Sequence, residues 1–141
     1  MPSPAVPIPQ GKYLPAVRHG DMVFTSGMTP RREGKLLHAG RVLVSDSLEK
    51  HRDAVVLACG NALTAARSVL APDERLERIL NMTVFIAAEP GFQDHARLAD
   101  FASAFLQEEM GDAGIGTRAA VGMGSLPGDA TVEIQLVAAI Q

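Results

Sequence analysis

The chain has 141 residues and a mass of 14.9 kDa, which is the length of one ordinary domain. Hydrophobic residues make up 47% and charged residues 21%, which excludes a disordered chain, and no apolar run approaches the ~18 residues of a transmembrane helix. The net charge of −3, the scattered basic residues and the 4% aromatic content argue against a nucleic-acid or membrane partner.

The first third of the chain predicts an arm and a hairpin. Residues 1–11 hold four prolines and are expected to form an extended arm. A first strand over 13–19, broken or edged at Pro15, a turn at Gly20 and Asp21, and a second strand over 22–26 form the predicted hairpin. Residues 27–44 carry several glycines and are expected to be a loop that can hold a short strand over 41–44.

A first helix is predicted by apolar residues that recur at helical spacing over 48–70, before Pro72. Ser45 or Ser47 is its expected N-cap. Gly60 and Asn61 in its middle cost on the order of 1 kcal/mol by helix propensity. Close packing or a hydrogen bond from the Asn61 side chain would each explain this pair.

The second half alternates strand and helix. We predict a buried strand over 79–87, a second helix over 94–110, and two strands over 118–123 and 131–140. Residues 111–116 and 125–129 connect these elements. The order of elements predicts a single α+β domain over 1–141, with one sheet and two helices on one face.

Few residues in the chain suggest metal or nucleophilic chemistry. The four histidines lie far apart and are expected at the surface, so we expect no metal site. Cys59 follows an apolar helical stretch and is expected to be a small buried hydrophobe. No nucleophile-elbow sequence supports a serine triad. With one cysteine and no secretory signal at the start, we expect a reduced, cytoplasmic setting.

The last quarter of the chain holds the candidate site. Because side chains alternate faces along a strand, Arg118, Ala120 and Gly122 share one face, and Glu133 and its alternate neighbours share another. We expect the apolar faces, including Ala119, Val121 and Met123, to pack on the helices, which leaves Arg118 and Glu133 together on the opposite face. The small neighbours of Arg118 leave room for a guest, and its planar fork suits a carboxylate. The alternative is a cross-strand Arg118–Glu133 ion pair on a solvated face, worth less than ~1 kcal/mol.

Four stretches are similar, in order and spacing, to those of a known family. They are Gly-Lys-Tyr-Leu-Pro-Ala-Val at 11–17, Val-Phe-Thr-Ser-Gly-Met-Thr-Pro at 23–30, Thr-Val-Phe-Ile at 83–86, and Thr-Arg-Ala at 117–119 with Leu-Pro at 126–127 and Val-Glu-Ile at 132–134. On these residues the chain resembles a divergent branch of the RidA family, also called the YjgF or endoribonuclease L-PSP family. The resemblance implies a chorismate-mutase-like α+β fold, a homotrimer with clefts between subunits, and cofactor-free hydrolysis of enamines and imines to 2-keto acids and ammonia.

The resemblance also implies roles for individual residues. Arg118 is similar to the arginine that binds the substrate carboxylate, and Glu133 to the acidic residue that positions or activates water. The remaining residues expected at the cleft are Tyr13, Ser26, Gly27 and Ala120, the last at a position that is often Cys or Thr. The expected partners are therefore a small carboxylate-bearing substrate and other copies of the chain.

Several positions depart from the family pattern. Met28 replaces a glutamine, Gly116 and Thr117 replace the usual Pro-Ala, and the expected asparagine of the second helix corresponds to Asp100 or Leu98. These departures keep open a carboxylate-binding regulatory trimer without turnover. The name of the family adds a ribonuclease as a further alternative, against which the acidic charge, the missing histidine pair and the few aromatic residues weigh.

Overall fold

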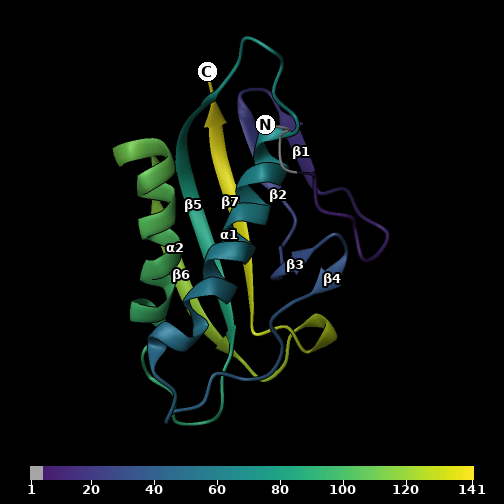
Figure 1. The fold of residues 1–141 in the computed structure, drawn as a ribbon. Helices are drawn as coiled ribbons and strands as arrows, with labels where there is room; N and C mark the ends of the chain where they lie inside the picture. Colours follow the sequence, from purple (N-terminus) through teal and green to yellow (C-terminus); the bar gives the residue numbers. More distant parts are fainter. Residues whose placement is uncertain (1–4) are drawn as a thin grey trace.

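A five-stranded sheet forms the centre of the molecule, with two helices on one of its faces (Figure 1). The computed structural model describes residues 5–141, so the first four residues of the predicted arm lie outside the described part. The strand order is β1-β2-β7-β5-β6, and only β5 and β6 pair in parallel, which makes the sheet mixed. The elements are β1 Ala16–His19, β2 Met22–Thr25, β3 Arg31–Arg32, β4 Lys35–Leu36, α1 Arg52–Arg67, β5 Leu76–Ala87, α2 His95–Met110, β6 Thr117–Met123 and β7 Val132–Ile140.

The core lies between the sheet and the helices. Alternate residues of β7, including Val132, Ile134 and Leu136, are fully buried beneath α1, as predicted from their alternation. The side of α1 that is buried is rich in alanine, which lets helix and sheet approach closely. The α+β class and the two helices on one face are therefore confirmed. No helix among residues 5–141 is long and apolar enough to span a membrane.

The side-chain hydrogen bonds of Asn61 account for this residue in the middle of α1. Its amide nitrogen donates to the carbonyl oxygens of Thr29 at 3.0 Å and Arg31 at 2.8 Å. These two bonds tie α1 to the segment that enters the β3–β4 hairpin. Of the two explanations for the pair at 60 and 61, the structure supports the side-chain hydrogen bond.

Local predictions differ from the structure at several positions. A β3–β4 hairpin forms in the predicted loop, and the predicted strand over 41–44 is reduced to one bridge between Val42 and Ala88. The first strand is broken at Pro15, as one of the two expectations had it, and begins at Ala16, because proline does not donate to a ladder. Ser47 precedes a short 3-10 turn, η1 Leu48–His51, without a side-chain capping bond. The helix itself ends at Arg67, earlier than predicted.

The faces of β6 are opposite to those predicted. Parallel pairing sets Arg118 beside Met82 and Ala120 beside Val84, and these β5 residues are 3% and 0% exposed on the helix side. Arg118, Ala120 and Gly122 therefore face α2. The start of α2 lies so close that a Cβ at Gly122 would stand 2.7 Å from Nε2 of His95. The small residues of β6 thus reflect the close approach of a helix.

No helix among residues 5–141 covers the other face of the sheet, and this face carries apolar side chains. These are Val17, Met22, Phe24, Val121 and Met123, each between 37% and 49% exposed. Glu133 lies on this same face, because it pairs with Phe85 and through it with Val121. We call this surface the open face.

Candidate functional site

Arg118 lies at the edge of the sheet, held by α2. Its Nη1 donates to Oδ1 of Asp100 at 2.8 Å and to Oγ of Ser103 at 3.0 Å, and its Nη2 donates to the carbonyl oxygen of Ala96 at 3.1 Å. The Arg118 side chain is 23% exposed, whereas that of Asp100 is 68% exposed. The guanidinium is therefore fixed in position, and its charge is balanced by an aspartate of its own chain.

The contacts of Arg118 also distinguish the two helix residues considered for the family's asparagine. Leu98 is fully buried in the core and offers no polar group. Asp100 points to the guanidinium and accepts a hydrogen bond from it. Asp100 is thus the residue that stands beside the arginine in this chain.

Glu133 lies on the open face, against the end of β2. A Cβ atom at Gly27 would overlap Oε2 of Glu133, so the carboxylate fits here because residue 27 has no side chain. The Met28 amide donates to the carbonyl of Ile134 at 2.7 Å, which holds the two segments together. Partial burial raises the pKa of the Glu133 carboxyl above its ordinary value. A carboxyl in this environment is suited to exchanging a proton.

Ser26 and Gly27 follow β2, and Tyr13 lies close to them. The Ser26 hydroxyl donates to the carbonyl of Leu14 at 2.6 Å, and the Tyr13 hydroxyl accepts from the Gln10 amide at 2.9 Å. Tyr13 and Gly27 both line a cavity of about 700 Å³. These three predicted site residues therefore lie together, away from Arg118.

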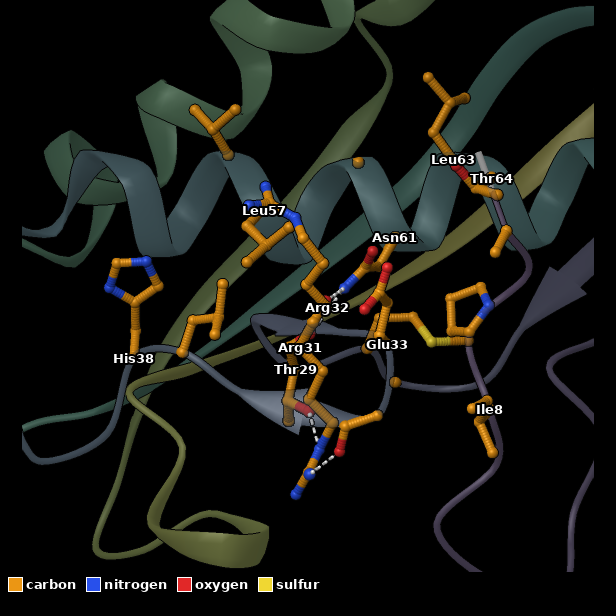
Figure 2. A pocket seen from close by; sticks show the side chains of 18 of the residues that line it. Ile8, Thr29, Arg31, Arg32, Glu33, His38, Leu57, Asn61, Leu63 and Thr64 are labelled. Carbon is orange, nitrogen blue, oxygen red and sulfur yellow. Dashed lines mark hydrogen bonds between the residues drawn. The ribbon is translucent and has the colours of Figure 1, made fainter. Parts of the chain in front are cut away.

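This cavity was not expected from the sequence. Figure 2 shows Asn61 and Thr64 of α1 on one side, with Arg32 and Glu33 of the β3–β4 hairpin facing them and Ile8 of the arm nearby. Both charge signs occur on its wall. Its residues come from a segment predicted to be loop and from a helix face, and no sequence pattern links the two.

The two halves of the predicted site are separated by the sheet. Arg118 and Ala120 face α2, whereas Glu133 lies on the open face, with β5 between their strands. A small ligand bound to Arg118 therefore does not touch Glu133 of the same chain. The predicted shared face is wrong, and so is the alternative cross-strand ion pair, because Arg118 pairs with Asp100.

Other candidate chemistry is absent or explained. Among residues 5–141 no group of three His, Cys, Asp or Glu side chains is arranged to hold a metal ion. Cys59 is fully buried, as expected, and burial raises the pKa of its thiol to about 12. His51 differs from the expected surface position: it is buried, with Nε2 at 2.8 Å from Oδ2 of Asp46.

Comparisons with known proteins agree with the fold. The sequence profile of the family described as Endoribonuclease L-PSP matches residues 4–140. Protein TCP17 of Trypanosoma cruzi is 25% identical over 132 residues, which are 93% of this chain and 82% of that protein. The structure of the protein Atu1372 from Agrobacterium tumefaciens matches with a TM-score of 0.85 and 29% identity over 95% of this chain and 86% of that one. TdcF from Escherichia coli, solved with bound serine, matches with a TM-score of 0.65 and 28% identity over 95% of this chain and 92% of that one.

Proposed function

The chain belongs to the endoribonuclease L-PSP family, also called RidA or YjgF, and on that premise we propose that it hydrolyses reactive imines and enamines, 2-imino acids among them, in clefts between neighbouring copies. The observation that carries this proposal is the placement of Arg118 and Glu133 on opposite faces of one sheet. Each chain holds two halves of a site that do not meet. A neighbouring copy that covers the open face would bring its Arg118 edge to Glu133.

The apolar character of the open face supports this assembly. Val17, Phe24 and Val121 are large apolar side chains, each more than a third exposed, on a face that also holds Glu133. Contiguous apolar surface of this kind marks an interaction site. In the homotrimer that the resemblance implies, a closed ring buries the same surface on every copy.

The chemistry requires only a positioned cation and a carboxyl. Arg118 would orient the substrate carboxylate and with it the C=N carbon, and the bound serine of TdcF is a small carboxylate-bearing molecule of the kind expected. Water adds to the carbon of the protonated imine, and the carbinolamine then loses ammonia to leave the keto group. Glu133 would hold the water and move its proton, a role typically worth about 10²–10⁴-fold in rate.

The test is release of ammonia and keto acid from a freshly generated 2-imino acid. We expect wild-type protein to accelerate this release, and the Arg118→Ala and Glu133→Gln variants each to lower the acceleration at least about 100-fold. Arg97→Ala is the matched control, because Arg97 is an exposed arginine of α2 whose ion-pair partner is Asp94. Release at the rate of buffer alone by wild-type protein would refute the hydrolase.

A second candidate is a carboxylate-binding trimer without turnover. The observation that favours it is the position of Ala120, where a polar side chain is common in the family and the methyl group here offers no proton donor. Calorimetric titration with pyruvate separates the two functions. Saturable binding that depends on Arg118, without acceleration of hydrolysis, would support the binding protein.

A further inference from the structure

We infer that Asp100 weakens the preference of the Arg118 site for carboxylates, so that the site also accepts uncharged imines and enamines. This inference rests on the proposed function and extends its substrate class. It starts from the ion pair: Nη1 of Arg118 donates to Oδ1 of Asp100 at 2.8 Å. A substrate carboxylate would be the second negative group on one guanidinium.

The donors of Arg118 are not all used. A guanidinium has five N–H groups, and Asp100, Ser103 and Ala96 accept from three of them. Nε has no partner among residues 5–141, and Nη2 makes one bond there. Because the Arg118 side chain is 23% exposed, we expect a ligand to reach these donors without displacing Asp100. The hydrogen-bonding capacity of the arginine remains, while its positive charge is already balanced.

This separation of charge from hydrogen bonding affects two ligand classes differently. An uncharged carbonyl oxygen or imine nitrogen accepts hydrogen bonds from the free donors, and its binding is little affected by the charge of Asp100. A carboxylate gains the same hydrogen bonds but is repelled by the Asp100 carboxylate across the guanidinium. Since Asp100 is 68% exposed, solvent screens part of this repulsion. We expect it to lower carboxylate affinity about tenfold, a size typical of close charges near a protein surface.

The experiment replaces Asp100 by its uncharged isostere. In Asp100→Asn the side chain keeps an oxygen that accepts from Arg118, so the arginine stays in place while the competing charge is removed. Asp94→Asn is the matched control, because Asp94 precedes the same helix but pairs with Arg97 at 3.9 Å. The probes are pyruvate and its uncharged amide, pyruvamide, titrated calorimetrically into each protein.

The expected result is a change in one ligand only. In Asp100→Asn the Kd of pyruvate falls about tenfold, while the Kd of pyruvamide changes less than about twofold and Asp94→Asn behaves as wild type for both. The inference is overturned if Asp100→Asn leaves the Kd of pyruvate unchanged or tightens the binding of both ligands equally. It is also overturned if neither wild type nor Asp100→Asn binds pyruvate. A tightening of pyruvate that persists when Arg118→Ala is added to Asp100→Asn overturns it as well.

Hydrolysis is measured separately, so that the two proposals fail in different ways. If pyruvate binding responds to Asp100→Asn but no variant releases ammonia from an imine, the charge competition holds and the hydrolase is refuted. If ammonia is released but pyruvate binding does not respond, the hydrolase holds and the competition is refuted. When both hold, wild type turns over uncharged imines as well as 2-imino acids, and Asp100→Asn shifts the ratio toward the acids.

Discussion

The Arg118 edge and the Glu133 end of the open face differ in how their charges are satisfied. Arg118 is bound by an aspartate, a hydroxyl and a carbonyl of its own α2. Glu133 lies partly buried against Gly27, with no hydrogen-bond or ion-pair partner among residues 5–141. The charge of Arg118 is thus paired within its own chain, and among the same residues the charge of Glu133 is not. This partly desolvated acid, on an apolar surface that no helix among residues 5–141 covers, is where the proposed neighbouring copy would dock.

Of the predicted effects, the largest is the loss of activity in a Gly27 variant, which tests the Glu133 region. In Gly27→Ala the new Cβ would collide with the Glu133 carboxylate, since its position overlaps that of Oε2. The carboxyl must move away, so we expect kcat/KM for imine hydrolysis to fall about 100-fold, as for loss of a proton-transfer group. Gly124→Ala is the control, because no atom lies within 4 Å of its Cβ. Equal activity of the two variants would break the link between Gly27 and Glu133.

At the other region we expect a stability effect. Arg118→Ala removes three hydrogen bonds between β6 and α2, one of them to a charged partner. It also removes the packing contacts of the aliphatic part of the arginine side chain. The free energy of unfolding should fall by about 1–2 kcal/mol, measured by urea denaturation. Arg97→Ala, whose side chain is 74% exposed, should change it by less than about 0.5 kcal/mol. A stability of Arg118→Ala equal to that of wild type would show that the edge is not held by these bonds.

Glu133→Gln should raise the free energy of unfolding, whereas Arg118→Ala lowers it. Because the pKa of Glu133 is raised in the folded chain, the folded state holds its proton longer than the unfolded state. Stability therefore falls as pH rises from the ordinary glutamate pKa through the raised value, and the glutamine removes this loss. We expect a gain of less than about 1 kcal/mol at neutral pH and none in acid, since the group keeps part of its solvent.

The measurement for Glu133→Gln is thermal melting as a function of pH. Glu77→Gln serves as control, because Glu77 is an exposed glutamate of β5. A variant less stable than wild type at neutral pH would mean that Glu133 has a stabilising partner, which would contradict the contrast between the two regions.

The smallest effect is expected at Cys59, which belongs to neither region. Its thiol is fully buried, and its pKa is raised to about 12, so the native protein holds almost no reactive thiolate. Iodoacetamide should label it only as fast as the protein unfolds and should leave activity unchanged. Rapid labelling with loss of activity would show that Cys59 is reactive and lies near the site, which would contradict its position in the core.

The sequence predicted the elements better than their faces. The alternation of β7 identified its buried side because Val132, Ile134 and Leu136 are all large and apolar. In β6 the same argument failed, because its larger apolar residues, Val121 and Met123, lie on the open face. Alternation shows which residues share a face, but not whether a helix or another copy covers it.

The contacts of the site depended on tertiary structure. The resemblance placed Gly27 and Glu133 at one cleft, but not in contact, because they are more than 100 residues apart. A hydrogen bond from Asn61 was one of two explanations, but its partners, about 30 residues away, were not predicted. Asp100 was considered only because of the family resemblance. Its role as partner of Arg118 required the geometry of α2 beside β6.

The most direct test of the account is to mix two inactive variants. If each cleft takes Arg118 from one copy and Glu133 from its neighbour, Arg118→Ala and Glu133→Gln chains refolded together form some clefts with both native residues. With equal amounts and random assembly, about a quarter of the wild-type activity should return, since each cleft has one chance in two of each native residue. Activity that stays at the level of the separate variants would contradict a site shared between copies.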